Sequence, residues 1–168
     1  NLMMLDNNDI DISNNIIKAN ITISQTVSPS AMYGVDRTNI KVWNNIIYDF
    51  KDLSGTKGIG INLTYGSTYV YNNTVYNFGN VGINSANNGI LAKNNLSYNN
   101  SDNYKYSLDN ASTNNISGPA QSDAPGISPV NAVTVTFVDE DNNDFRLMPE
   151  SAGVDAGVDL SSDATSSF

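Results

Sequence analysis

The sequence predicts an all-β fold, a parallel β-helix in which short strands stack coil upon coil. An asparagine pair recurs at 14-15, 44-45, 72-73, 94-95 and 114-115, with spacings of 30, 28, 22 and 20 residues. The segments around each pair are rich in Val, Ile, Thr and Tyr, which favours strands over helices. A period in the twenties with variable insertions is typical of a solenoid whose loops differ in length while its coil stays constant.

Composition supports a turn-rich β structure and excludes several kinds of chemistry. Of the 168 residues, 28 are asparagine, a residue that favours turns and left-handed backbone positions. The chain has no cysteine and no histidine, which excludes disulfides, thiolate metal sites and Ser-His-Asp or Cys-His catalysis. The net charge is −9, so the basic face of a nucleic-acid-binding protein is not expected. No apolar run is long enough to span a membrane.

In each coil, one strand is predicted before the asparagine pair and one strand after it. Before the pair, alternate positions form one set of inward columns: Ile10 and Ile12, Ile40 and Val42, Thr68 and Val70, Ile90 and Ala92. After the pair, the corresponding residues are Ile17, Ile47, Val75 and Ser97. A tyrosine column follows them: Tyr48, Tyr76 and Tyr98.

The asparagine pair itself is predicted to form the bend between these strands. Asparagine tolerates the left-handed backbone region better than most residues, and a sharp bend needs such a residue. Stacked asparagine side chains can also hydrogen-bond along the solenoid axis, which satisfies amide groups that would be costly to bury alone. We therefore expect one axial row containing Asn15, Asn45, Asn73 and Asn95, or the asparagines that precede them.

A further strand is predicted between successive pairs. The segments YGVD (33–36), GIGIN (58–62), VGIN (81–84) and YSLD (106–109) share one form. Their apolar residues would point inward: Val35, Ile61, Ile83 and Leu108. The polar residues that follow would form an outward column: Asp36, Asn62, Asn84 and Asp109. Each coil would then hold three strands, stacked about 4.8 Å apart in four to five coils.

The C-terminal part is predicted to leave the coil pattern. We divide the chain into coils over residues 1–118 and an irregular capping tail over residues 119–168, which carries nine acids and one base. The end of a solenoid exposes its apolar core and needs a cap. We expect the tail to fold back along or over the last coil, with its apolar side chains facing the barrel: Val135, Phe137, Phe145 and Leu147.

These repeats resemble a known superfamily. VWNNIIYDF (42–50), VYNNTVYNF (70–78), AKNNLSYNN (92–100) and the tail motifs DFRL (144–147) and SAGVDAG (151–157) are similar to the right-handed parallel β-helix proteins of the pectate-lyase-like type. The resemblance implies a right-handed coil and a secreted or cell-surface location. It also suggests a piece of a longer protein. It is specific for fold rather than function, because the superfamily includes lyases, hydrolases, epimerases and non-catalytic adhesins.

The outward column is the first candidate site. Four polar side chains at one-strand spacing (Asp36, Asn62, Asn84 and Asp109) could bind a sugar chain or a hard cation through their oxygens. Arg37, Lys57 and Lys105 are the neighbouring bases. An anionic polymer would need a cation such as Ca²⁺ here, because the two aspartates repel carboxylates. The alternative interpretation is an ordinary solvated sheet face.

Two aromatic residues form the second candidate site. Trp43 and Tyr71 occupy matching outward positions of successive coils and could offer a flat platform to sugar rings. They could equally be an ordinary cross-strand pair that stabilises the sheet.

Three hypotheses of function remain open. The first is an extracellular module that is carbohydrate-associated or surface-structural, with a polysaccharide or cell-surface glycan as partner and no complete catalytic site. The second is a polysaccharide lyase acting on acidic glycans, which is favoured over a glycoside hydrolase because the hydrolase signature is missing. The third is a filament subunit that self-associates through exposed strand edges at the ends of the coil stack.

Overall fold

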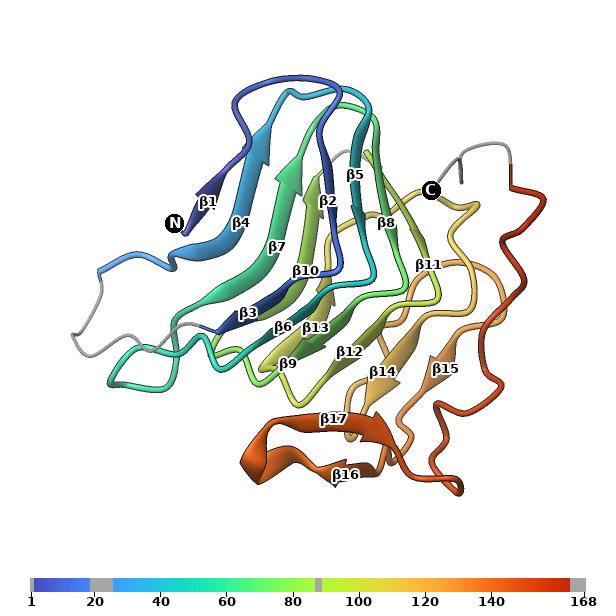
Figure 1. Ribbon diagram of the computed structural model, residues 1–168. Coiled ribbons are helices and arrows are strands. Elements are labelled where there is room, and N and C mark those ends of the chain that lie inside the picture. The colour runs from blue at the N-terminus through green and yellow to red at the C-terminus, as the bar shows by residue number, and fades with distance from the viewer. Residues whose placement is uncertain (1, 19–25, 87–88, 164–168) are drawn as a thin grey trace.

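The structure of the chain is a computed structural model that describes residues 2–18, 26–86 and 89–163. Parallel strands stack into a β-helix of about four turns, as predicted (Figure 1). Sheet A contains β1 (Met3–Met4), β4 (Ser30–Val35), β7 (Ile59–Thr64), β10 (Val81–Ala86) and β13 (Asp102–Lys105). Sheet B contains β2 (Asp11–Ser13), β5 (Ile40–Trp43), β8 (Thr68–Tyr71) and β11 (Ile90–Lys93). Sheet C contains β3 (Ile16–Lys18), β6 (Ile46–Tyr48), β9 (Thr74–Tyr76), β12 (Leu96–Tyr98), β14 (Ile116–Gly118) and β15 (Val130–Asn131).

The core follows the predicted columns in sheets B and C. Ile12, Val42, Val70 and Ala92 lie in one register row and are all buried. Ile17, Ile47, Val75 and Ser97 lie in another. Because side chains alternate between the two faces of a strand, this register leaves Trp43 and the tyrosine column on the outer faces.

The asparagine pairs form the predicted bend and ladder. The first member of each pair has a left-handed backbone, with φ between 51° and 58° at Asn14, Asn44, Asn72, Asn94 and Asn114. The second member is buried from the second coil onward. The backbone N–H and Nδ2 of Asn45 both donate to Oδ1 of Asn73, at 3.0 Å each. The same two bonds join Asn15 to Asn45, Asn73 to Asn95, and Asn95 to Asn115.

Parallel stacking continues into the segment that we assigned to the C-terminal tail. β15 pairs in parallel with β14, and Ile127 bridges to Thr113, so the stacking continues past residue 118 to Asn131. Residues 127–131 therefore stack on the coils, inside the segment that we assigned to the capping tail. The stacking continues because Val130 and Asn131 still find parallel backbone partners in β14.

After residue 131 an antiparallel hairpin forms, with β16 (Phe137–Asp139) joined to β17 (Asp144–Leu147) through the 3₁₀ helix η1 (Glu140–Asn142). The hairpin lies against sheet C (Figure 1). Phe145 contacts the rings of Tyr48 and Tyr76, with ring centroids 4.8 and 5.3 Å apart, and Phe137 contacts Tyr98. Val135, Phe137 and Phe145 are buried and Leu147 packs beside them, so these four residues do face the coils. They cover the side of the solenoid rather than its end.

Among the described residues, the one helical element is η1. Within the ranges given above, no helix has the length and apolar character needed to cross a membrane.

Candidate functional site

The outer face of sheet A carries a row of polar side chains, but the row differs from the predicted column. Tyr33 pairs with Asn62, Asn62 with Asn84, and Asn84 with Lys105. Asn62 and Asn84 were correctly matched. The prediction that Asp36 and Asp109 continue this column is wrong, because they lie three and four residues beyond the positions that pair. We call Tyr33, Asn62, Asn84 and Lys105 the sheet A row.

Asp36 and Asp109 occupy turns instead. Asp36 follows the end of β4 with φ of 54°, and its N–H donates to the Thr64 carbonyl. Asp109 donates its N–H to the Ile90 carbonyl, and its Oδ1 accepts from the Ala111 N–H. Arg37, which follows Asp36, donates from Nε to the carbonyl of Leu5 at 3.3 Å. These residues shape the corners of the coil and are not brought into the row.

The two asparagines of the row hydrogen-bond along the face of the sheet. Nδ2 of Asn84 donates to Oδ1 of Asn62 at 2.7 Å, and Nδ2 of Asn62 donates to Oγ of Ser30 at 3.0 Å. Asn84 is only 8 % exposed, and its Oδ1 is buried without a hydrogen bond from any protein group in the described ranges. A buried acceptor without a donor costs about 1–3 kcal/mol. The row therefore contains a buried acceptor whose hydrogen bonding is incomplete in this conformation.

Two carboxyl groups lie next to the Lys105 end of the row. Asp102 lies on β13 with Lys105, and the Nζ of Lys105 is 3.9 Å from its Oδ2. Partial burial raises the pKa of Asp102, and the neighbouring carboxyl group of Asp123 raises it further, while Lys105 opposes the change. Asp102 is thus a carboxyl group that holds its proton to higher pH than usual, beside a lysine.

Asp123 has a structural task of its own. Its Oδ2 accepts from the N–H groups of Asn103 and Tyr104, at 3.0 and 2.9 Å, and its Oδ1 accepts from Ser117 Oγ. These bonds satisfy backbone donors of β13, the last strand of sheet A. Sequence reasoning missed this carboxyl pair, because Asp123 lies 21 residues after Asp102 in a segment that we assigned to the cap.

The second candidate site, Trp43 and Tyr71, is aligned as predicted but is not an open platform. The two residues pair in register on sheet B. Tyr71 is 0 % exposed, and Lys93 Nζ lies 5.5 Å from the centre of its ring. Trp43 donates from Nε1 to Asp11 Oδ1 at 2.6 Å. Tyr71 is therefore closed to a sugar ring in this conformation.

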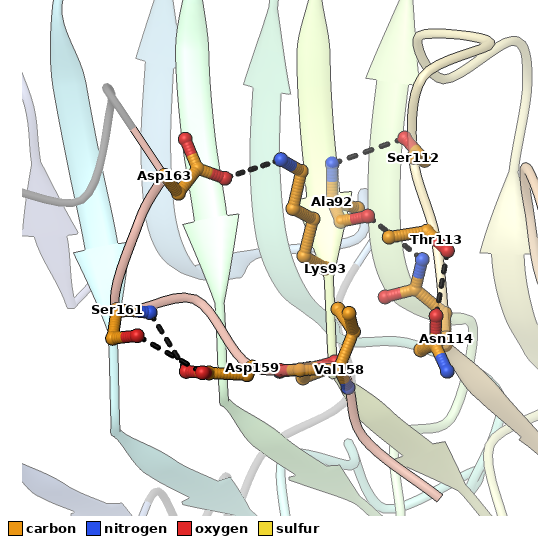
Figure 2. Close-up of polar contacts among 11 residues, drawn as sticks. Ala92, Lys93, Ser112, Thr113, Asn114, Val158, Asp159, Ser161 and Asp163 are labelled. Atoms are coloured by element: carbon orange, nitrogen blue, oxygen red, sulfur yellow. Dashed lines mark hydrogen bonds and ion pairs between the residues drawn. The ribbon is translucent and has the colours of Figure 1, made fainter.

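The C-terminal segment 156–163, which we call the strap, crosses this part of the solenoid (Figure 2). Asp163 forms an ion pair with Lys93. Asn94 exchanges two hydrogen bonds of 2.8 Å with the backbone N–H and carbonyl of Val158, and Asn114 donates to the Ala156 carbonyl. The half-buried corner asparagines Asn94 and Asn114 thus hold the strap in place.

A pocket of about 250 Å³ lies between the asparagine corner and the cap, with Asn72, Asn94, Phe145 and Leu147 among its lining residues. The strap already engages the amide group of Asn94. The pocket is therefore a gap beside the strap, and the sheet A row remains the better candidate site.

The described parts of the chain hold no group of three or more Asp, Glu, His or Cys side chains that could bind a metal ion. Asp102 and Asp123 are a pair, and Ca²⁺ would need further oxygen ligands from a substrate or from water.

No protein-family model, no curated protein and no solved structure matches this chain. The structure shows the β-helix fold, whereas membership of the pectate-lyase-like superfamily stays a prediction from the sequence.

Proposed function

We propose that the chain is a carbohydrate-associated β-helix module that binds a glycan along the sheet A row. The observation that carries the proposal is the register row of Tyr33, Asn62, Asn84 and Lys105, which places one such side chain on each coil. The Oδ1 of Asn84 is buried without a donor, and the side chain would have to turn outward to meet a sugar hydroxyl. A polymer that crosses stacked strands meets one side chain per coil, and sugar hydroxyl groups can donate to an amide oxygen as well as accept from an amide or an ammonium group. We also propose an exported or cell-surface location, which rests on the resemblance alone.

Charge favours a neutral glycan over an acidic one. The whole chain has a net charge of −9, and Lys105 is the only cation of the row. The carboxyl group of Asp102 lies beside that lysine and reduces its attraction for anions. Tyr33 at the other end of the row offers an aromatic ring on which a sugar could stack.

A glycan array followed by calorimetric titration tests this proposal. Asn84→Ala removes the acceptor, and we expect affinity for the best array ligand to fall about tenfold, since one hydrogen bond contributes ~0.5–1.5 kcal/mol. Thr64→Ala is the matched control, because Thr64 lies on sheet A outside the row; its affinity should stay within about twofold of the parent. A parent chain that binds no glycan, or an Asn84→Ala variant that binds like the parent, would refute the proposal.

A second candidate function, a polysaccharide lyase, is favoured by the Asp102 and Asp123 pair beside Lys105. In this alternative Lys105 removes the proton at C5 of an acidic sugar, the electron pair forms a C4=C5 double bond, and the glycosidic oxygen leaves C4 and takes a proton from water. The carboxyl groups interact with the substrate carboxylate directly or through a cation. The measurement is the ultraviolet absorbance of unsaturated products from acidic polysaccharides, with and without Ca²⁺. Lys105→Ala should abolish the activity and Lys57→Ala should preserve it. Absence of product with the parent chain would exclude this function.

A further inference from the structure

The asparagine ladder has a direction. In every step the asparagine of the earlier coil donates its backbone N–H and its Nδ2 to the Oδ1 of the later one. A ladder of this kind has two unlike ends. The earlier end presents an unused acceptor, and the later end presents unused donors.

The later end of the ladder is closed. The register that pairs Ile116 with Val130 places Pro129 opposite Asn115, where a further asparagine would be needed. Asn115 is fully buried and keeps the Nδ2 bond to the preceding coil that the ladder residues from Asn45 onward make, here to the Ala92 carbonyl at 2.8 Å. In place of a further asparagine, its Nδ2 donates to the Pro125 carbonyl at 3.5 Å. No further coil can extend the ladder there.

The earlier end of the ladder is open. Asn15 uses its N–H and Nδ2 toward Asn45, and none of the groups placed by the structure donates to its Oδ1. The three sheets also end here, because β1, β2 and β3 are their outermost strands. Core residues of this coil are only partly covered (Met3, Ile10 and Ile17), and Ile16 is 73 % exposed. Unpaired strand edges above a partly covered core bind further strands readily.

We propose that this end of the solenoid is a docking surface for another coil of the same repeat, added in parallel. The incoming coil must carry an asparagine at the ladder position, because the open group is an acceptor that needs both a backbone N–H and an Nδ2 donor. It must present three strands in the same order to pair with β1, β2 and β3 together. The C-terminal end of a second copy does not meet these requirements, since its ladder is closed at Asn115. The partner is therefore a coil whose donors are free, and not this chain joined head to tail.

The test adds such a coil to the full chain. A copy of residues 81–101 placed directly before residue 1 puts the copied Ile83 opposite Met3, since Ile83, Ile61, Met32 and Met3 share one register row. It also puts the copied Asn95 next to Asn15. We expect the melting temperature to rise by about 5 °C or more, because each added neighbour interface stabilises a solenoid. Amide hydrogen exchange in β1, β2 and β3 should slow at least tenfold.

Two variants separate the ladder from simple lengthening of the chain. One carries alanine in place of the copied Asn95, and the other carries the intact copy with Asn15→Ala in the parent part. Each fusion is compared with an unfused chain that has the same residue at position 15. Both variants should lose most of the gain in melting temperature and most of the added protection from hydrogen exchange. Equal gains in all three fusions, or no protection of the first coil, would overturn the proposal.

Sedimentation of the unmodified chain at increasing concentration tests the exclusion of a second copy. A monomer supports the proposal, and head-to-tail polymers would overturn it. These outcomes are independent of glycan binding by the sheet A row.

Discussion

The two asparagines of each pair perform different tasks, although they are neighbours of the same type. Asn72 has a left-handed backbone with φ of 53° and an exposed side chain. Asn73 is 1 % exposed, and its amide group joins Asn45 on one side to Asn95 on the other. The backbone conformation is what matters at the first position, and the side-chain hydrogen bonds are what matter at the second.

This difference predicts a large loss of stability on substitution at the second position and a small change at the first. Asn73→Ala should lower the free energy of unfolding by about 3 kcal/mol, because it removes the acceptor of the buried Asn45 N–H and the Nδ2 group that donates to the carbonyls of Val42 and Tyr71. Asn72→Gly should change it by less than about 1 kcal/mol, since glycine accepts the left-handed region without strain. Urea denaturation of both variants measures the contrast. Similar losses of unfolding free energy in the two variants would contradict a ladder formed by the second asparagine of each pair alone.

Asp102 makes a pH-dependent contribution. Its pKa is raised in the folded chain above the ordinary value of 3.8. The folded state therefore binds this proton more tightly than the unfolded chain does. The stability from this group is fully present below the ordinary pKa and is lost as pH rises through the raised pKa.

Asp102→Asn should therefore raise stability at neutral pH. It should also remove the loss of stability that this group causes as the pH rises. The measurement is the melting temperature as a function of pH, from about the ordinary pKa of a carboxyl group upward. Asp6→Asn is the control, because it removes the same charge at an exposed position of the first coil. If the melting temperatures of the Asp102→Asn variant and the parent differ by the same amount at every pH, the pKa of Asp102 is not raised.

At the scale of the elements, sequence reasoning succeeded where the asparagine pair fixed the register. Sheets B and C directly flank the pair, so their columns could be aligned by counting from it. Sheet A lies at a variable distance. Ser30 follows Asn15 by 15 residues, whereas Asp102 follows Asn95 by 7. We aligned its strands by similarity of form, which matched Asn62 with Asn84 but displaced Asp36 and Asp109.

The contacts made by the tail could not be predicted in the same way. Asp123 meets Asp102, and Asp163 meets Lys93, across long stretches of sequence with no repeat to guide an alignment. The apolar pattern of the hairpin did predict which residues are buried, because Val135, Phe137 and Phe145 alternate with exposed positions. It did not predict that they cover the side of sheet C.

The hairpin should be essential for solubility. Phe137 and Phe145 contact the rings of Tyr48, Tyr76 and Tyr98 on sheet C. Deleting residues 132–168 would expose this aromatic surface while leaving β15 in place. We expect the truncated chain to bind a dye specific for apolar surface and to aggregate on concentration. Light scattering measures this outcome, and a soluble, cooperatively folding product would show that the hairpin is dispensable.

At the scale of the whole molecule, the two ends of the solenoid differ. A stack of coils is stabilised mainly by contacts between neighbouring coils, so an uncovered end opens more readily than the middle. The C-terminal side is secured by the Asp123 carboxylate, by the hairpin and by the strap. The first coil has no such cover among the described residues, and its ladder residue Asn15 is exposed.

Hydrogen exchange of the unmodified chain should therefore show a gradient. Protection is expected to be lowest in β1, β2 and β3, to rise through β4 to β6, and to be highest in β8 to β12, because local opening needs less free energy where fewer neighbours must be broken. Asn73→Ala should lower protection mainly in the coils next to Asn73, whereas a fully cooperative domain would lose it everywhere. Exchange measured by mass spectrometry at peptide resolution separates these patterns. Uniform protection from β1 to β14 would show that the coils open as a single unit and that the first coil is as well supported as the last.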